Sequence, residues 1–220
     1  MMPSRPLIIA LGGLKRSGKD TFAGILAAAA LARQLTPHRI AFADPLRRAT
    51  AAAYALEGGE DHFGDELKDT VDPAWGITRR QMLIHVGEAM RGVDADHWTK
   101  LLTRGVDSFE TAARRYTPAH KPLHIVTDMR RPNEAKALLD LGATLVLVVR
   151  DGTVWDGHET EAMAGMATGR WRSGCSPLHY HLVVENAFPV GGDASMIPAA
   201  TAAFEKAANQ LIDAVLTARG

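Results

Sequence analysis

The chain has 220 residues, 46% of them hydrophobic and 23% charged, which excludes a compositionally disordered protein and suits one α/β domain with insertions. Its 25 basic and 25 acidic side chains give a formal net charge of zero, so no overall field draws it to nucleic acid or to an anionic membrane. The only cysteine, Cys175, excludes an intramolecular disulfide and a multi-cysteine zinc site, and we expect a cytoplasmic protein.

The first half of the chain begins with an apolar run over residues 7–14 that leads into glycines and predicts a buried strand. An alanine-rich helix is expected over 20–35, ended by Pro37, then a strand over 39–43 and a helix over 46–56. No apolar run is long enough to span a bilayer, so we expect no membrane segment.

The middle of the chain starts with residues 57–76, which are rich in glycine and acidic side chains and predict a loop. Helices are expected over 78–91, with Thr78 as the N-cap, and over 94–109. A strand over 123–129 and a helix over 132–141 follow.

The last part predicts a strand over 143–150, then a polar stretch over 151–176 that is weakly helical around 159–166. A final strand over 180–186 and a helix over about 197–218 end the pattern. Strands that alternate with helices predict an α/β fold with a doubly wound, five-stranded parallel sheet and helices on both faces.

Ligands bind such sheets beyond the carboxyl ends of the strands. The polar motifs gather at that edge: a glycine loop follows the first strand, Asp44 the second, Asp128 and Arg130 the third, and Arg150 the fourth. We therefore look for the functional site there.

The stretch "GGLKRSGKDTFA" nearly completes the phosphate-binding pattern G-x-x-x-x-G-K followed by Ser or Thr. Gly13, Gly18 and Lys19 have the required spacing. The glycines let the loop fold around a phosphate chain so that main-chain N–H groups bind its oxygens, and Lys19 can reach the β- and γ-phosphates.

Asp20 stands where the pattern has a hydroxyl residue, and three roles stay open for it. It can hold Mg²⁺ directly or through water, pair with Lys15 or Arg16, or stabilise the N-terminus of the helix.

The stretch "VTDMRRPNEA" ends a strand at Asp128, a position suited to a carboxylate that holds magnesium or its water. Arg130 can face the same side of the strand edge, and Asn133 and Glu134 open the next helix. These residues suit metal or sugar contacts beside a bound phosphate. The alternative is an acidic and basic group that caps a helix.

Further candidates lie on the predicted helices. Arg80 and Arg91 are three turns apart on one face and can span a nucleotide, although a solvated surface role is about as good an interpretation for each. Trp98 is either an aromatic wall for a base or part of the core, and the core is slightly favoured.

The polar stretch 151–176 suits a lid, in which Arg170 and Arg172 would exclude water and stabilise phosphoryl charge. His158, Glu159 and Glu161 in its "HETEAM" segment can also be interpreted as metal ligands, but no second ligand group has matching spacing, so this reading is disfavoured.

The segments "GLKRSGKDTFA", "FADPL", "DHWTKLL", "VTDMRRPNEA", "HETEAM" and "VVEN", in this order along the chain, resemble the deoxynucleoside monophosphate kinases of tailed bacteriophages. The resemblance implies a P-loop kinase that transfers the γ-phosphoryl group of ATP to a deoxynucleoside monophosphate with Mg²⁺. In that family an aspartate after the loop lysine is usual. One domain over 1–220 is then expected, with an acceptor-binding helical segment over about 57–110 and the lid over about 151–176.

The family resemblance, added to the residue patterns above, implies the following site residues. ATP would be bound by Gly13, Lys15, Arg16, Ser17, Gly18, Lys19, Asp20 and Thr21. The acceptor would be bound by Asp44, Arg80, Arg91, Trp98, Asp128, Arg130, Asn133 and Glu134. The metal would be bound by Asp20, Thr21 and Asp128. The lid arginines would be Arg150, Arg170 and Arg172. The catalytic residues would be Lys19, Asp128 and Arg130.

Other functions stay open at this point. One is a different small-molecule kinase, such as a dephospho-coenzyme A or phosphomevalonate kinase, and another is a P-loop NTPase switch or nucleotide-binding module. We expect nucleotides as the partners, and neither nucleic acid nor membrane; whether the protein forms a homodimer is left open.

Overall fold

The computed structural model describes residues 5–57, 62–64, 66–117, 119, 121–157, 159–174, 179–188 and 194–218. Cys175 and His158 lie outside this part of the chain. The chain separates into two compact units, which we call the first unit (Met1–Ile40 with Val106–Gly220) and the second unit (Ala41–Gly105). The segment 57–110 falls mostly in the second unit, and the single domain expected from the sequence stays a prediction.

The first unit is built on a parallel sheet of five strands in the order β2-β3-β1-β4-β5. The strands are β1 (Leu7–Gly12), β2 (Leu35–Ile40), β3 (Lys121–Val126), β4 (Thr144–Arg150) and β5 (Leu182–Asn186). Because β1 lies between β3 and β4, the order of the strands reverses there, and ligands of open α/β sheets bind at such a point.

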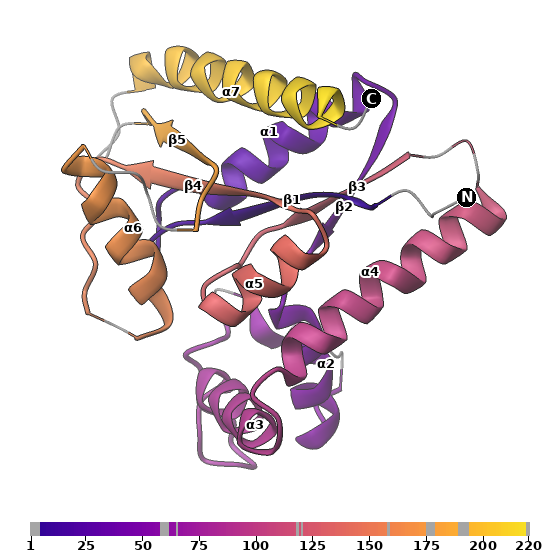
Figure 1. Ribbon diagram of the computed structural model, residues 1–220. Coiled ribbons are helices and arrows are strands. Elements are labelled where there is room, and N and C mark those ends of the chain that lie inside the picture. Colours follow the sequence, from indigo (N-terminus) through magenta and orange to yellow (C-terminus); the bar gives the residue numbers. More distant parts are fainter. Residues whose placement is uncertain are drawn as a thin grey trace. The chain divides into compact units, whose positions relative to one another are not determined.

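Helices cover both faces of this sheet, as expected (Figure 1). On one face α1 (Lys19–Leu31) lies beside α7 (Ile197–Thr217), and the rings of Phe22 and Phe204 meet edge to face with centroids 5.1 Å apart. Ile9 and Leu11 of β1 point into this core because alternate side chains of a strand share a face. On the opposite face α5 (Pro132–Asp140) packs on β4, and α6 (Ala162–Arg172) also packs on β4.

The predicted helix over 20–35 and strand over 39–43 are wrong at their shared boundary. Helix α1 ends at Leu31, Gln34 turns the chain with a φ of 60°, and β2 already begins at Leu35. The strand pairs with Lys121–Val126 and contains Pro37. Proline lacks an N–H group, but β2 is an edge strand, where this loss is tolerated.

The second unit contains α2 (Ala43–Ala53) and α3 (Arg79–Val93), which pack together. Thr78 is the N-cap of α3, as predicted: its hydroxyl accepts from the Gln81 N–H at 3.2 Å, and the Gln81 side chain accepts from the Thr78 N–H at 2.7 Å. Helix α4 (His97–Tyr116) begins in this unit and ends in the first, beyond the expected end at 109.

The remaining boundaries differ from the predicted ones by a few residues. Helix α2 begins and ends three residues before the predicted range 46–56, and β5 begins at Leu182 rather than at 180. The stretch 151–176 holds the short helix η2 (Glu159–Glu161) and then α6, and η3 (Ala194–Met196) precedes α7. Within the described ranges, none of the helices combines the length and the apolar character needed to cross a bilayer.

Candidate phosphate-binding site

The loop between β1 and α1, residues 13–18, is called the glycine loop below. Its backbone has positive φ angles at Gly13 (150°), Arg16 (63°) and Gly18 (95°). A Cβ atom at Gly13 would lie 2.4 Å from the carbonyl oxygen of Val148, so only glycine fits between the loop and β4. The loop leads directly into α1 at Lys19, the arrangement that presents main-chain N–H groups to an anion.

Lys19 is the first residue of α1 and follows this loop directly. Its Nζ atom donates hydrogen bonds to the carbonyl oxygens of Gly13 and Leu14, both at 2.9 Å. The pKa of Lys19 is lowered to about 8, mainly by burial and also by the nearby Arg130 guanidinium. The carboxylates of Glu161, Asp20 and Asp128 act in the opposite direction. Lys19 therefore has three acidic groups and one arginine within electrostatic range.

The other predicted ATP-binding side chains divide into exposed and buried ones. Lys15, Arg16 and Thr21 are exposed, whereas Ser17 is fully buried. The Ser17 hydroxyl has no hydrogen-bond partner among the described residues, and the Ser17 N–H donates to the Leu14 carbonyl at 3.1 Å. The backbone of Ser17 therefore closes a turn of the loop, its side chain is buried, and its role toward ATP stays a prediction.

Asp20 stands in the first turn of α1 with 85% of its side chain exposed. Its partner is Arg39 of β2 at 3.2 Å, and not Lys15 or Arg16, two partners that the sequence suggested. An exposed pair at this distance is weak, so the carboxylate can exchange Arg39 for another cation at little cost.

The segment after β3 brings Asp128, Arg130 and Glu134 together. Glu134 is buried, and one carboxylate oxygen accepts from the N–H groups of Arg130 at 2.8 Å and Arg131 at 3.0 Å. Burial raises the pKa of Glu134, the two N–H donors oppose this shift, and the charge of Asp128 adds to it. Glu134 therefore fixes the backbone that carries Arg130, while Asp128 is half-buried and Arg130 exposed.

Asn133 is half-buried in the first turn of α5, beside Glu134. Asp44 lies in the second unit, in the first turn of α2, where its carboxylate accepts from the Ala41 N–H at 2.7 Å and lies 3.6 Å from Arg47. With these contacts Asp44 stabilises the N-terminus of α2.

The three remaining predicted acceptor residues also belong to the second unit. Arg80 pairs with Asp69 at 2.7 Å, and Arg91 with Glu88 at 2.6 Å. Trp98 is only 3% exposed, and its indole N–H donates to the Gly87 carbonyl at 3.2 Å. Trp98 is therefore part of the core, the alternative that the sequence favoured, and is not an open wall for a base.

Two of the predicted lid arginines bind main-chain carbonyl groups. Arg150, at the end of β4, donates to the carbonyl of Phe188 at 3.1 Å and makes a longer contact of 3.4 Å to that of Arg16. Arg172, in α6, donates to the carbonyls of Arg150 at 2.9 Å and Thr153 at 3.1 Å. Arg170 is exposed near the end of the same helix. The hydrogen bonds of Arg172 thus connect α6 to the end of β4, and those of Arg150 connect the end of β4 to the chain after β5.

Sequence reasoning missed three residues that lie close to the glycine loop. The sequence suggests for Glu161 only a disfavoured metal cluster, yet its charge acts on Lys19. Asn186, the last residue of β5, contacts Ser17 and Gly18, and buried Tyr180 lies against Gly12. A polar residue that ends a buried strand at the ligand-binding edge was a usable signal for Asn186. Nothing in the sequence marked Tyr180.

The carboxylates near Lys19 decide whether this site can take a divalent cation. Among the described residues there is no group of three or more His, Cys, Asp or Glu side chains that can hold an ion. Mg²⁺ in nucleotide enzymes typically uses one or two carboxylates and completes its shell with phosphates and water. Asp20 and Asp128, both close enough to influence Lys19, can supply such carboxylates.

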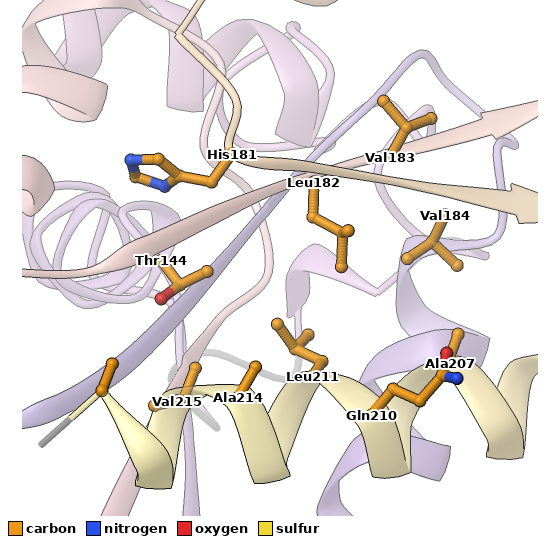
Figure 2. Close-up of a pocket in the computed structure, with 11 residues that line it drawn as sticks. Thr144, His181, Leu182, Val183, Val184, Ala207, Gln210, Leu211, Ala214 and Val215 are labelled. Atoms are coloured by element: carbon orange, nitrogen blue, oxygen red, sulfur yellow. The ribbon is translucent and has the colours of Figure 1, made fainter. Parts of the chain in front are cut away.

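A cavity of about 450 Å³ lies elsewhere in the first unit, between β5 and α7 (Figure 2). Leu182 and Val184 face Leu211 and other apolar side chains of α7 across it. Its lining contains no residue of the predicted site and no acidic or basic side chain apart from His181, so it is unsuited to a phosphate.

One curated relative supports a kinase. A protein of Acanthamoeba polyphaga mimivirus named "Putative deoxynucleotide monophosphate kinase" is 30% identical over 154 residues, which cover 68% of this chain and 77% of the viral protein. A crystal structure of a "putative kinase" from Chloroflexus aurantiacus J-10-fl covers 99% of both chains, with 14% identity and a TM-score of 0.41. No protein-family model matches the chain.

Proposed function

Because the chain belongs to the deoxynucleotide monophosphate kinase family, we propose that it transfers the γ-phosphoryl group of ATP to a deoxynucleoside monophosphate, giving ADP and the diphosphate. Phosphoryl transfer requires little covalent chemistry from the protein, so catalysis depends on positioning and on charge neutralisation.

The observation that carries the proposal is the position of Lys19. Its ammonium group lies on the carbonyls of Gly13 and Leu14, in range of Arg130, Glu161, Asp20 and Asp128. A phosphate chain bound by the N–H groups of the glycine loop would meet this ammonium group, which would stabilise the charge that develops on the transferred phosphoryl. Glycine-loop geometry alone would suit many anions, whereas the added acidic groups suit a nucleotide bound with a cation.

Asp20 and Asp128 are the residues that would hold Mg²⁺, with Thr21 beside Asp20. The bound ion would neutralise phosphate charge and orient the β- and γ-phosphates. For Asp20, the weak and exposed pair with Arg39 leaves its carboxylate available for this role.

Arg130 is the residue of the first unit that we assign to the acceptor phosphate. The buried carboxylate of Glu134 orients its backbone, which leaves the exposed guanidinium for a ligand. Arg80 and Arg91 belong to the second unit, and their role toward the acceptor stays a prediction. We do not assign Trp98 to the acceptor, because it is buried.

A coupled assay of ADP release tests the proposal, with ATP, Mg²⁺ and a panel of the four common deoxynucleoside monophosphates, their ribose counterparts, dephospho-coenzyme A and phosphomevalonate. We expect turnover that depends on at least one deoxynucleotide. Turnover with only dephospho-coenzyme A or phosphomevalonate would assign a different kinase, and hydrolysis at the same rate without any acceptor would indicate an NTPase.

A further inference from the structure

The end of β5 makes a contact with the glycine loop that the proposed chemistry does not use. Asn186 is buried, and its side-chain Nδ2 atom donates to the carbonyl oxygen of Ser17 at 2.8 Å. Its Oδ1 atom accepts from the N–H of Phe188 at 2.9 Å. Both ends of the amide group are therefore engaged, which fixes its orientation.

The bond to Ser17 also determines where the next N–H group points. In a trans peptide the carbonyl of Ser17 and the N–H of Gly18 point in opposite directions. When Asn186 holds the carbonyl on the side of β5, the Gly18 N–H is turned to the other side. N–H groups of such a loop, at the start of a helix, are the groups that bind phosphate oxygens.

Gly18 is adapted to the same contact. Its φ of 95° lies in the left-handed region, and a Cβ atom there would be 2.2 Å from Nδ2 of Asn186. The side-chain amide can approach the loop this closely only because residue 18 is glycine. The second glycine of the loop is thus needed for Asn186 as well as for the turn.

Arg150 contacts the residues next to those that Asn186 binds. Its guanidinium donates to the carbonyl of Phe188, the residue whose N–H binds Asn186, and makes the longer contact to Arg16 in the loop. The ends of β4 and β5 therefore hold two consecutive carbonyl groups of the glycine loop, those of Arg16 and Ser17.

We propose that Asn186 is a positioning residue that orients the Gly18 N–H toward a phosphate of the nucleoside triphosphate. This inference rests on the proposed use of ATP. Asn186 does not touch the ligand itself, so its loss should weaken ATP binding through the loop and leave the binding of the acceptor unchanged.

The test compares Asn186→Ala, which removes the side-chain amide, with Asn186→Asp, which keeps the shape and the acceptor for Phe188 but cannot donate to Ser17. Binding of ATP and of the deoxynucleotide acceptor is measured separately by calorimetry, and KM for each is measured by ADP release. Asn209→Asp is the matched control, because Asn209 lies on α7 and contacts Arg33 and Glu205.

We expect both Asn186 variants to raise the Kd and KM for ATP by about tenfold, the effect of one lost hydrogen bond, with the acceptor constants within twofold of the wild type. Asn209→Asp should change neither constant. A weakening by Asn186→Asp alone would indicate only charge repulsion and would overturn the proposal, as would folded variants with normal ATP affinity. If the wild type binds ATP but transfers nothing, the proposed function fails, and the ATP-binding measurements still decide the role of Asn186.

Discussion

The ammonium nitrogen of Lys19 lies 2.9 Å from the carbonyl oxygen of Gly13, the first glycine of the loop that leads into α1. A single turn of backbone thus brings a basic side chain back onto the carbonyls of its own loop. The group is desolvated there, and this burial is the main reason that its pKa falls to about 8.

Replacement of Lys19 by methionine should lower kcat by at least about 100-fold, since it keeps most of the side-chain length but removes the charge that we propose for stabilising the transferred phosphoryl. Turnover is measured by ADP release and folding by thermal denaturation. Lys136→Met is the control: Lys136 is an exposed residue of α5 that pairs with Asp140. Activity near the wild-type level in a folded Lys19→Met protein would refute the assignment of the site.

The affinity for ATP should fall as the pH rises through about 8. In the free protein Lys19 loses its proton near this pH, whereas bound phosphate favours the charged form and raises the pKa. Binding near pH 8.5 should therefore take up a proton, which calorimetry detects as a different heat in buffers of different ionisation enthalpy. This proton uptake should vanish in Lys19→Met, and equal uptake in that variant would show that another group titrates.

Tyr180→Phe should stabilise the protein or leave its stability unchanged. The Tyr180 side chain is buried against Gly12, and its hydroxyl has no hydrogen-bond partner among the described residues. A buried hydroxyl without a partner is costly, so its removal should raise the free energy of unfolding by about 1 kcal/mol, measured in urea. Tyr116→Phe, at a ring that is 73% exposed, should have an effect near zero. A loss of 1 kcal/mol or more in Tyr180→Phe would contradict this account.

Acid should destabilise the protein through His124, which is fully buried in β3 and faces Glu110 of α4. Its Nε2 atom faces the carboxylate of Glu110 at 3.0 Å, its Nδ1 atom faces Nδ1 of His38 at 3.1 Å, and Arg114 lies 3.4 Å from Glu110. Burial lowers the pKa of His124 below 6.5, although Glu110 opposes the shift.

Because the folded pKa of His124 is the lower one, the unfolded chain binds more protons below about pH 6.5, and the free energy of unfolding should fall as the pH falls. One proton accounts for at most about 1.4 kcal/mol per pH unit. Urea denaturation between pH 7.5 and 5 should give a smaller slope for His124→Gln than for the wild type. The exposed His85→Gln should keep the wild-type slope, and an unchanged slope in His124→Gln would contradict the prediction.

The parts of the fold that the sequence predicted correctly are those with strong local patterns. The apolar run before Gly13 is a buried central strand, and Thr78 with Gln81 forms the expected start of α3. The boundary between α1 and β2 differs from the prediction because a proline after an alanine-rich run indicates the end of a helix, whereas Pro37 lies inside β2. Only the pairing of β2 with β3 at the sheet edge makes a strand containing proline acceptable.

In the site, too, the sequence predicted the local pattern but not the long-range contacts. Spacing alone identified Gly13, Gly18 and Lys19, which the structure brings together in one loop. The end of a buried strand marks Asn186 as a candidate, but spacing could not predict its bond to Ser17 across 169 positions of sequence. Spacing also could not predict the pair between Asp20 and Arg39, which depends on where β2 lies. These contacts are products of the tertiary fold, and local patterns carry no information about them.

The central claim is that the chain transfers a phosphoryl group from ATP to a deoxynucleotide. It is tested most directly by incubating the protein with Mg²⁺, ATP labelled at the γ-phosphorus and each deoxynucleoside monophosphate, and by separating the products by thin-layer chromatography. We predict label in the deoxynucleoside diphosphate of at least one base, and its loss in Lys19→Met. Label found only in inorganic phosphate, at a rate that no deoxynucleotide changes, would contradict the claim.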